Sequence, residues 1–66
     1  MEECYDVEKV IGVVEMLSHS KGTYGRMLEQ IRYLKENDQE AFDKFSRIIE
    51  NQHFKDPVDI VLFFEQ

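Results

Sequence analysis

Apolar residues recur along this chain at intervals of three and four, the spacing at which side chains share one face of an α-helix. The pattern runs through three successive segments, and a shorter apolar segment follows them. The first covers about residues 6–17, the second begins at Ser20 or Thr23 and ends near Glu36, and the third covers about residues 38–52. The sequence therefore predicts an all-α fold, a small bundle of three amphipathic helices plus a short C-terminal helix. Residues 1–66 should form a single helical domain whose short connections make the helices near neighbours.

The apolar positions of the three segments define the expected core faces. Polar residues predict where the helices begin: Asp6 should cap the first segment, and Asn37, three positions before Glu40, should cap the third. Gly12 lowers helix stability, so its expected benefit is the close approach of another helix. The expected core residues are Val7, Val10, Ile11, Val14 and Leu17, then Tyr24, Met27, Leu28, Ile31 and Leu34, then Phe42, Phe45, Ile48 and Ile49.

The C-terminal segment has the sharpest local pattern and an unusual distribution of apolar residues. Asp56 is a strong N-cap and Pro57 suits the first helical position, so the last helix should run from Pro57 to about Glu65. Val58, Val61, Leu62 and Glu65 define one face, and Ile60, Phe63 and Phe64 occupy the others. A helix that is apolar all round must be covered all round. Either it lies centrally, or it leaves an apolar patch for a partner or for a dimer.

The most specialised stretch is Ser20-Lys21-Gly22-Thr23-Tyr24-Gly25-Arg26, which concentrates glycine, tyrosine and basic residues. One interpretation is structural: the two glycines permit a close helix approach or form the turn, Tyr24 is mostly buried, and Arg26 pairs with a carboxylate of the first or third helix. The other interpretation is functional, with Lys21, Tyr24 and Arg26 contacting a partner. The sequence leaves both interpretations open.

Two motifs together resemble a known kind of protein. The S-x-G-x-Y-G-R pattern of residues 20–26 and the F-x-D-P-x-D pattern of residues 54–59, followed by an apolar helix, resemble small, acidic, functionally uncharacterised bacterial proteins carried by phages and other mobile elements. The resemblance spans most of the chain. It implies a biological setting and supports the helical interpretation, but it implies no catalytic residues.

The chain offers no set of residues suited to catalysis or to metal binding. Cys4 has no activating neighbour in sequence, and His19 and His53 are expected at the ends of two different helices, facing water. A zinc site needs three or four ligands that converge on one point. We therefore expect a non-enzymatic protein with no metal and no cofactor. No apolar run reaches the length that spans a bilayer, and a single cysteine suits a reducing cytoplasm.

Charge separates the two remaining classes of function. The 14 acidic residues outnumber the 8 basic ones and give a net charge of -6, which disfavours binding to a phosphate backbone. The sequence predicts a protein–protein interaction or regulatory accessory protein, whose partner is another protein or a second copy in a homodimer. The expected contact residues are Lys21, Tyr24, Arg26, Ile60, Phe63 and Phe64. The alternative is a nucleic-acid-associated regulator that uses the basic face of the second helix, formed by Lys21, Arg32 and Lys35.

Overall fold

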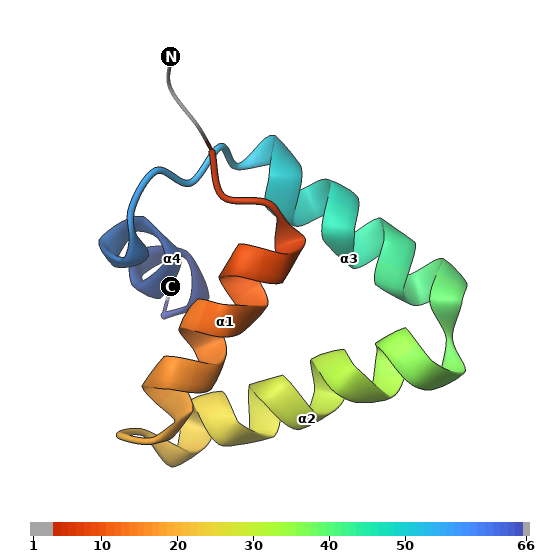
Figure 1. Ribbon diagram of the computed structural model, residues 1–66, viewed down its shortest axis with the longest axis horizontal. Coiled ribbons are helices and arrows are strands. Elements are labelled where there is room, and N and C mark those ends of the chain that lie inside the picture. Colours follow the sequence, from red (N-terminus) through yellow and green to blue (C-terminus); the bar gives the residue numbers. More distant parts are fainter. Residues whose placement is uncertain (1–3, 66) are drawn as a thin grey trace.

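The computed structural model describes residues 4–65, and all of the regular structure in that range is helical. The helices are α1 (Val7–Ser18), α2 (Gly22–Asn37), α3 (Gln39–Asn51) and α4 (Pro57–Phe64). In Figure 1 the first three helices outline a triangle and α4 lies beside α1. α1 contacts each of the other three helices. The predicted all-α bundle of three longer helices and a short fourth is confirmed.

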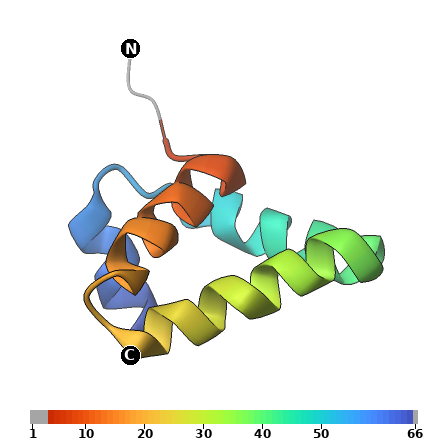
Figure 2. The same cartoon turned by 60° about the horizontal axis from the view of Figure 1, so that its bottom comes forward.

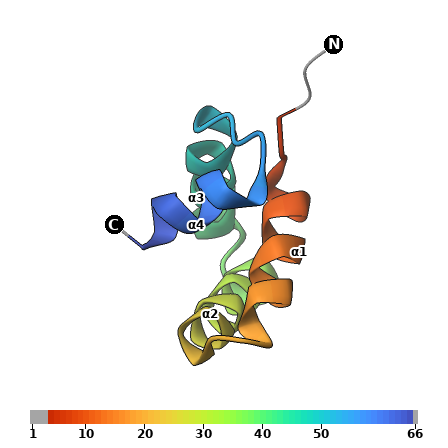
Figure 3. The same ribbon diagram turned by 90° about the vertical axis from the view of Figure 1, so that its left-hand side faces the viewer.

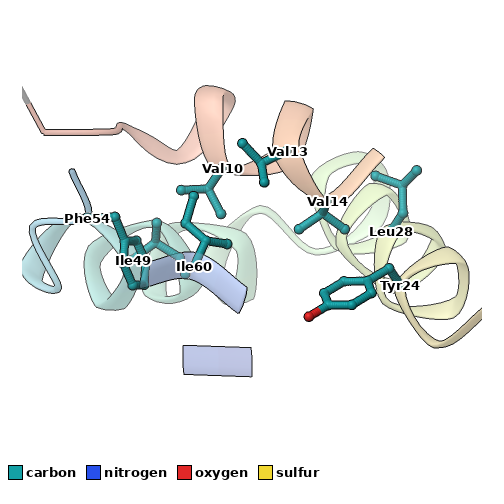
Figure 4. Packing of buried hydrophobic residues seen from close by; sticks show 8 residues of the cluster. All are labelled: Val10, Val13, Val14, Tyr24, Leu28, Ile49, Phe54 and Ile60. Carbon is teal, nitrogen blue, oxygen red and sulfur yellow. The ribbon is translucent and has the colours of Figure 1, made fainter. Parts of the chain in front are cut away.

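All four helices and the loop before α4 supply the main core cluster, and Ile31 and Phe42 are buried outside it. Figure 4 shows Ile49, Phe54 and Ile60 meeting Val10 at one end, while Val14, Leu28 and Tyr24 lie together at the other. Val13 joins the cluster although it lies outside the predicted stripe, because α1 is covered by helices on two sides. Burial of this apolar surface is the main force that holds the helices together.

α1 and α3 begin at aspartate caps. The Asp6 carboxylate accepts the backbone N–H of Lys9 at 2.9 Å, as predicted. α2 continues through Asn37, so Asp38 is the first residue free to cap α3, and it accepts the N–H of Ala41 at 3.1 Å. The prediction that Asn37 caps this helix is wrong, since its side chain remains on α2.

Two further expectations about packing are wrong. A Cβ built at Gly12 meets no atom within 4 Å, and the same holds at Gly22 and Gly25, so none of the glycines serves a close helix approach. Gly22 instead begins α2, with Gly25 in its first turn. Ile48 is 52% exposed, because α3 turns Phe42 and Ile49 toward the core.

α4 forms as the sequence predicts. The Asp56 carboxylate accepts the N–H of Asp59 at 3.1 Å, and Pro57 takes the first helical position. Phe54 packs back against the helix, with its ring edge-to-face on Phe63 at 5.4 Å between centroids. Among residues 4–65, no helix has both the length and the apolar character needed to cross a bilayer.

Candidate functional site

A hollow of about 320 Å³ lies between the start of α2 and the end of α4. It is lined by Lys21, Thr23, Tyr24, Met27, Phe64 and Glu65. In Figure 2 the last turn of α4 points toward the first turn of α2, which places residues distant in sequence around one opening. The structure thus joins three residues that the sequence assigned to two separate contact regions: Lys21 and Tyr24 from one, and Phe64 from the other.

Glu65 ties the two helices together at this hollow. The Tyr24 hydroxyl donates a hydrogen bond to Glu65 Oε2 at 2.8 Å, and Lys21 Nζ forms an ion pair with the same oxygen at 3.2 Å. The Tyr24 side chain projects from α2 toward α4 (Figure 4), and the residue is buried, as predicted. Glu65 was not among the predicted contact residues, although a buried tyrosine hydroxyl needs an acceptor and an acidic residue near it in space can supply one.

The pKa values of Tyr24 and Glu65 are both shifted in this contact. Burial raises the pKa of the Tyr24 phenol above its usual value of 10.0, and the hydrogen bond and negative charge of Glu65 raise it further. The hydrogen bond from Tyr24 lowers the pKa of Glu65 below its usual 4.5, and Lys21 adds a second hydrogen bond and its positive charge. Near neutral pH the carboxylate is charged and the phenol keeps its proton, so the contact fastens the end of α4 to α2.

Arg26 lies apart from the Glu65 contact. It is exposed and lines a separate shallow hollow with Gly22 and Thr23. The predicted pairing with a carboxylate of α1 or α3 is wrong, because Arg26 forms no ion pair within residues 4–65. Lys21 and Tyr24 therefore share the Glu65 contact, and Arg26 takes no part in it.

The other basic residues of α2 are matched to acidic residues of α1. Lys35 Nζ lies 3.1 Å from Glu8 Oε1, and Arg32 Nη2 lies 3.4 Å from Glu15 Oε1. All four side chains are about half exposed, and exposed pairs of this kind each stabilise a fold by less than about 1 kcal/mol. The basic face of α2 thus has carboxylate partners inside the chain, with which a phosphate group would have to compete.

The residues that α4 exposes are not those of the predicted contact patch. Ile60 is fully buried in the core, so the prediction that it contributes to a partner-binding surface is wrong. Phe63 and Phe64 are partly buried and pack edge-to-face on each other at 5.2 Å. Val58 and Leu62, by contrast, are 64% and 61% exposed. We call Val58 and Leu62 the outer face of α4; Figure 3 shows the backbone of this helix beside α1.

A second hollow adjoins the outer face of α4. We call this space of about 360 Å³ the α3–α4 hollow, and its lining residues are Gln52, His53, Phe54, Asp59, Leu62 and Phe63. Leu62 therefore belongs both to the outer face of α4 and to the α3–α4 hollow. His53 has a φ of 55°, a left-handed conformation that histidine tolerates better than most residues and that turns the chain away from α3.

Cys4 and His53 lie in contact, which no pattern in the sequence predicts. Cys4 Sγ lies 3.7 Å from His53 Nδ1, and the Tyr5 N–H donates to the Phe54 carbonyl at 2.8 Å, which holds the segment before α1 near the loop after α3. His19 lies elsewhere, at the C-terminal end of α1. No group of three or more His, Cys, Asp or Glu residues within residues 4–65 is placed to hold a metal ion.

Comparison of the chain with protein-family models, with curated proteins and with solved structures finds no match. A functional proposal for this protein therefore depends on its own surface and contacts.

Proposed function

We propose that this protein is a non-enzymatic interaction module that binds a protein partner through the outer face of α4. The observation that carries the proposal is the exposure of Val58 and Leu62, which lie one helical turn apart on the same side of the helix. Single exposed apolar residues are common on protein surfaces, but adjacent ones form a patch whose burial favours association. These two large side chains share an eight-residue helix.

The way in which α4 is held supports this role. Asp56 caps its first turn, Ile60 anchors its middle in the core, and Glu65 fastens its end to α2. A helix fixed at three points presents its outer side chains in a defined arrangement. Such preorganisation favours binding, because less conformational entropy is lost when the partner docks.

Charge supports a protein partner over nucleic acid. The net charge of -6 opposes a phosphate backbone, and Arg32 and Lys35 already have carboxylate partners on α1. We extend the proposal to an accessory or regulatory role in the cytoplasm, where the exposed thiol of Cys4 would remain reduced. A setting in a phage or mobile element follows from the motif resemblance alone.

Photo-crosslinking in the cell tests this function. A benzophenone amino acid at position 62 reports on the outer face of α4, and the same group at position 16 is the matched control, since Met16 is 65% exposed on α1. A discrete protein adduct from position 62 alone, lost when Val58→Asp is added, supports the proposal. Equal adducts from both positions, or none from position 62, reject it. A nucleic-acid adduct would instead favour the basic face of α2.

A further inference from the structure

The outer face of α4 is too small to form a stable interface alone. An eight-residue helix is about 12 Å long, whereas a stable interface buries about 800 Å² on each side, roughly a sixth of the 4935 Å² surface of this chain. A partner on Val58 and Leu62 must therefore also cover neighbouring surface. The α3–α4 hollow is that surface, because Leu62 lines it as well.

Three carboxylates, from Asp56, Asp59 and Glu65, lie along α4, and Lys55 directly precedes the first of them. Asp59 is exposed next to Val58 on α4, lines the α3–α4 hollow, and its carboxylate forms no ion pair within residues 4–65. Asp56 is exposed at the start of the helix, and Glu65 lies at its end with a side chain 45% exposed. Lys21 is already paired with Glu65. Asp59 therefore places an unpaired carboxylate beside the outer face of α4, which a basic group of a partner would neutralise.

We infer that the partner segment on α4 is an amphipathic helix of another protein, with an apolar stripe over Val58 and Leu62 and a lysine or arginine directed at Asp59. This inference rests on the proposed function and names its partner class. A helix suits a ridge of side chains one turn apart, because helices pack by setting such ridges into grooves. An apolar side chain of the partner would enter the α3–α4 hollow against Phe54 and Phe63.

The same charges argue against a second copy of this chain. In a two-fold symmetric dimer each residue of the patch contacts the equivalent patch of the other copy. The carboxylates of Asp56, Asp59 and Glu65 would then face the same acidic set of the other copy, and like charges placed together across an interface lower the affinity. The net charge of -6 on each copy adds to the repulsion.

The test uses a defined peptide and the full chain. The probe is a synthetic amphipathic helix with a leucine stripe flanked by lysines, and its control is the same peptide with glutamate in place of lysine. Binding is followed by two-dimensional amide NMR of the labelled protein. We expect shifts centred on residues 58–62 with the lysine peptide, and affinity at least about tenfold weaker with the glutamate peptide.

Matched variants locate the contact on the protein. Asp59→Asn and Leu62→Ala should each weaken lysine-peptide binding by about five- to tenfold. Glu36→Gln is the control: it removes one negative charge from an exposed position on α2 and should leave the affinity unchanged. Circular dichroism of each variant shows that the helices are retained. Equal weakening by Glu36→Gln and Asp59→Asn would mean diffuse charge attraction and would overturn the inference.

Two other outcomes would overturn this inference without deciding the proposed function. Sedimentation equilibrium could show a dimer that Leu62→Ala dissociates. That result would overturn the proposal of a basic helix from another protein, while α4 would remain an interaction surface. Absence of shifts at residues 58–62 with the lysine peptide would also overturn the inference. The photo-crosslinking at position 62 would still decide the proposed function independently.

Discussion

Replacing Ile60 with alanine tests which side of α4 belongs to the core. Ile60 is fully buried with Val10 and Ile49, whereas Leu62, two residues later on the same helix, is 61% exposed. The matched pair Ile60→Ala and Leu62→Ala removes the same number of carbons from opposite sides of one helix. Since isoleucine and leucine differ in helix propensity by only a few tenths of a kcal/mol, a larger difference between the two variants reports on burial.

The expected cost of Ile60→Ala is large for so small a protein. Three buried carbons at about 0.8 kcal/mol each give about 2.4 kcal/mol of lost transfer free energy. The remaining cavity raises the total into the usual range of about 2–5 kcal/mol for such a change. A domain of this size has only about 3–5 kcal/mol from its core, so Ile60→Ala should leave a substantial unfolded population. Leu62→Ala should change the free energy of unfolding by less than about 0.5 kcal/mol, as exposed substitutions do.

Urea unfolding followed by far-ultraviolet circular dichroism measures both values. Ile60→Val adds an intermediate point, because deletion of one buried methyl should cost about 0.5–1.5 kcal/mol. If Ile60→Ala were no more destabilising than Leu62→Ala, the burial of Ile60 would be refuted. The predicted contact patch with Ile60, Phe63 and Phe64 on the surface would then have to be restored.

The remaining predictions concern the cap of α4, a helix glycine and the Glu65 contact. Asp56→Ala should lower the free energy of unfolding by about 1 kcal/mol in urea melts, because the Asp59 N–H loses its acceptor, while Asp56→Asn should retain most of the stability. Gly12→Ala should raise it by about 0.5–1 kcal/mol, since the added methyl meets nothing. The lowered pKa of Glu65 contributes stability above its unfolded value of 4.5, which is lost as the pH falls through the folded value. The free energy of unfolding of Tyr24→Phe should therefore fall less steeply below pH 4.5 than that of the wild type. An equal dependence on pH in the two proteins would contradict this. The raised pKa of Tyr24 contributes stability that is fully present below its unfolded value of 10.0 and is lost as the pH rises through the folded value. Absorbance of the phenolate follows this titration.

Local chemistry accounts for what the sequence predicts well. The aspartate caps at Asp6 and Asp56 act on backbone groups three residues away, and Pro57 sets a single backbone angle, so neighbours in sequence suffice to place these boundaries. The cap of α3 was misplaced by one residue, from Asn37 to Asp38, because both residue types cap helices and only the length of α2 decides between them. Boundaries between adjacent helices are sensitive to such one-residue competition.

Side-chain contacts across the fold lie beyond sequence reasoning. The meeting of Tyr24 with Glu65 and that of Cys4 with His53 join residues more than forty positions apart. Each depends on the angles at which the helices cross, which no periodicity encodes. The exposure of Ile48 has the same origin, because the packing of α3 on the other helices buries Phe42 and Ile49 and leaves Ile48 outside.

The sequence predicts that α4 is apolar on every side, and the structure shows which side is covered. The sequence establishes that a helix apolar on every side needs cover on every side, but not which side the remaining chain covers. α1 covers the side that carries Ile60, and the Glu65 contact with Tyr24 fixes the rotation of the helix at its end. Val58 and Leu62 are consequently the residues left outside. Because the core contacts of Ile60 hold the middle of α4 while the Glu65 contact fixes only its end, a change that loosens the Glu65 contact should weaken partner binding more than it weakens the fold. Tyr24→Phe, compared in both the peptide titration and the urea melt, separates these two effects.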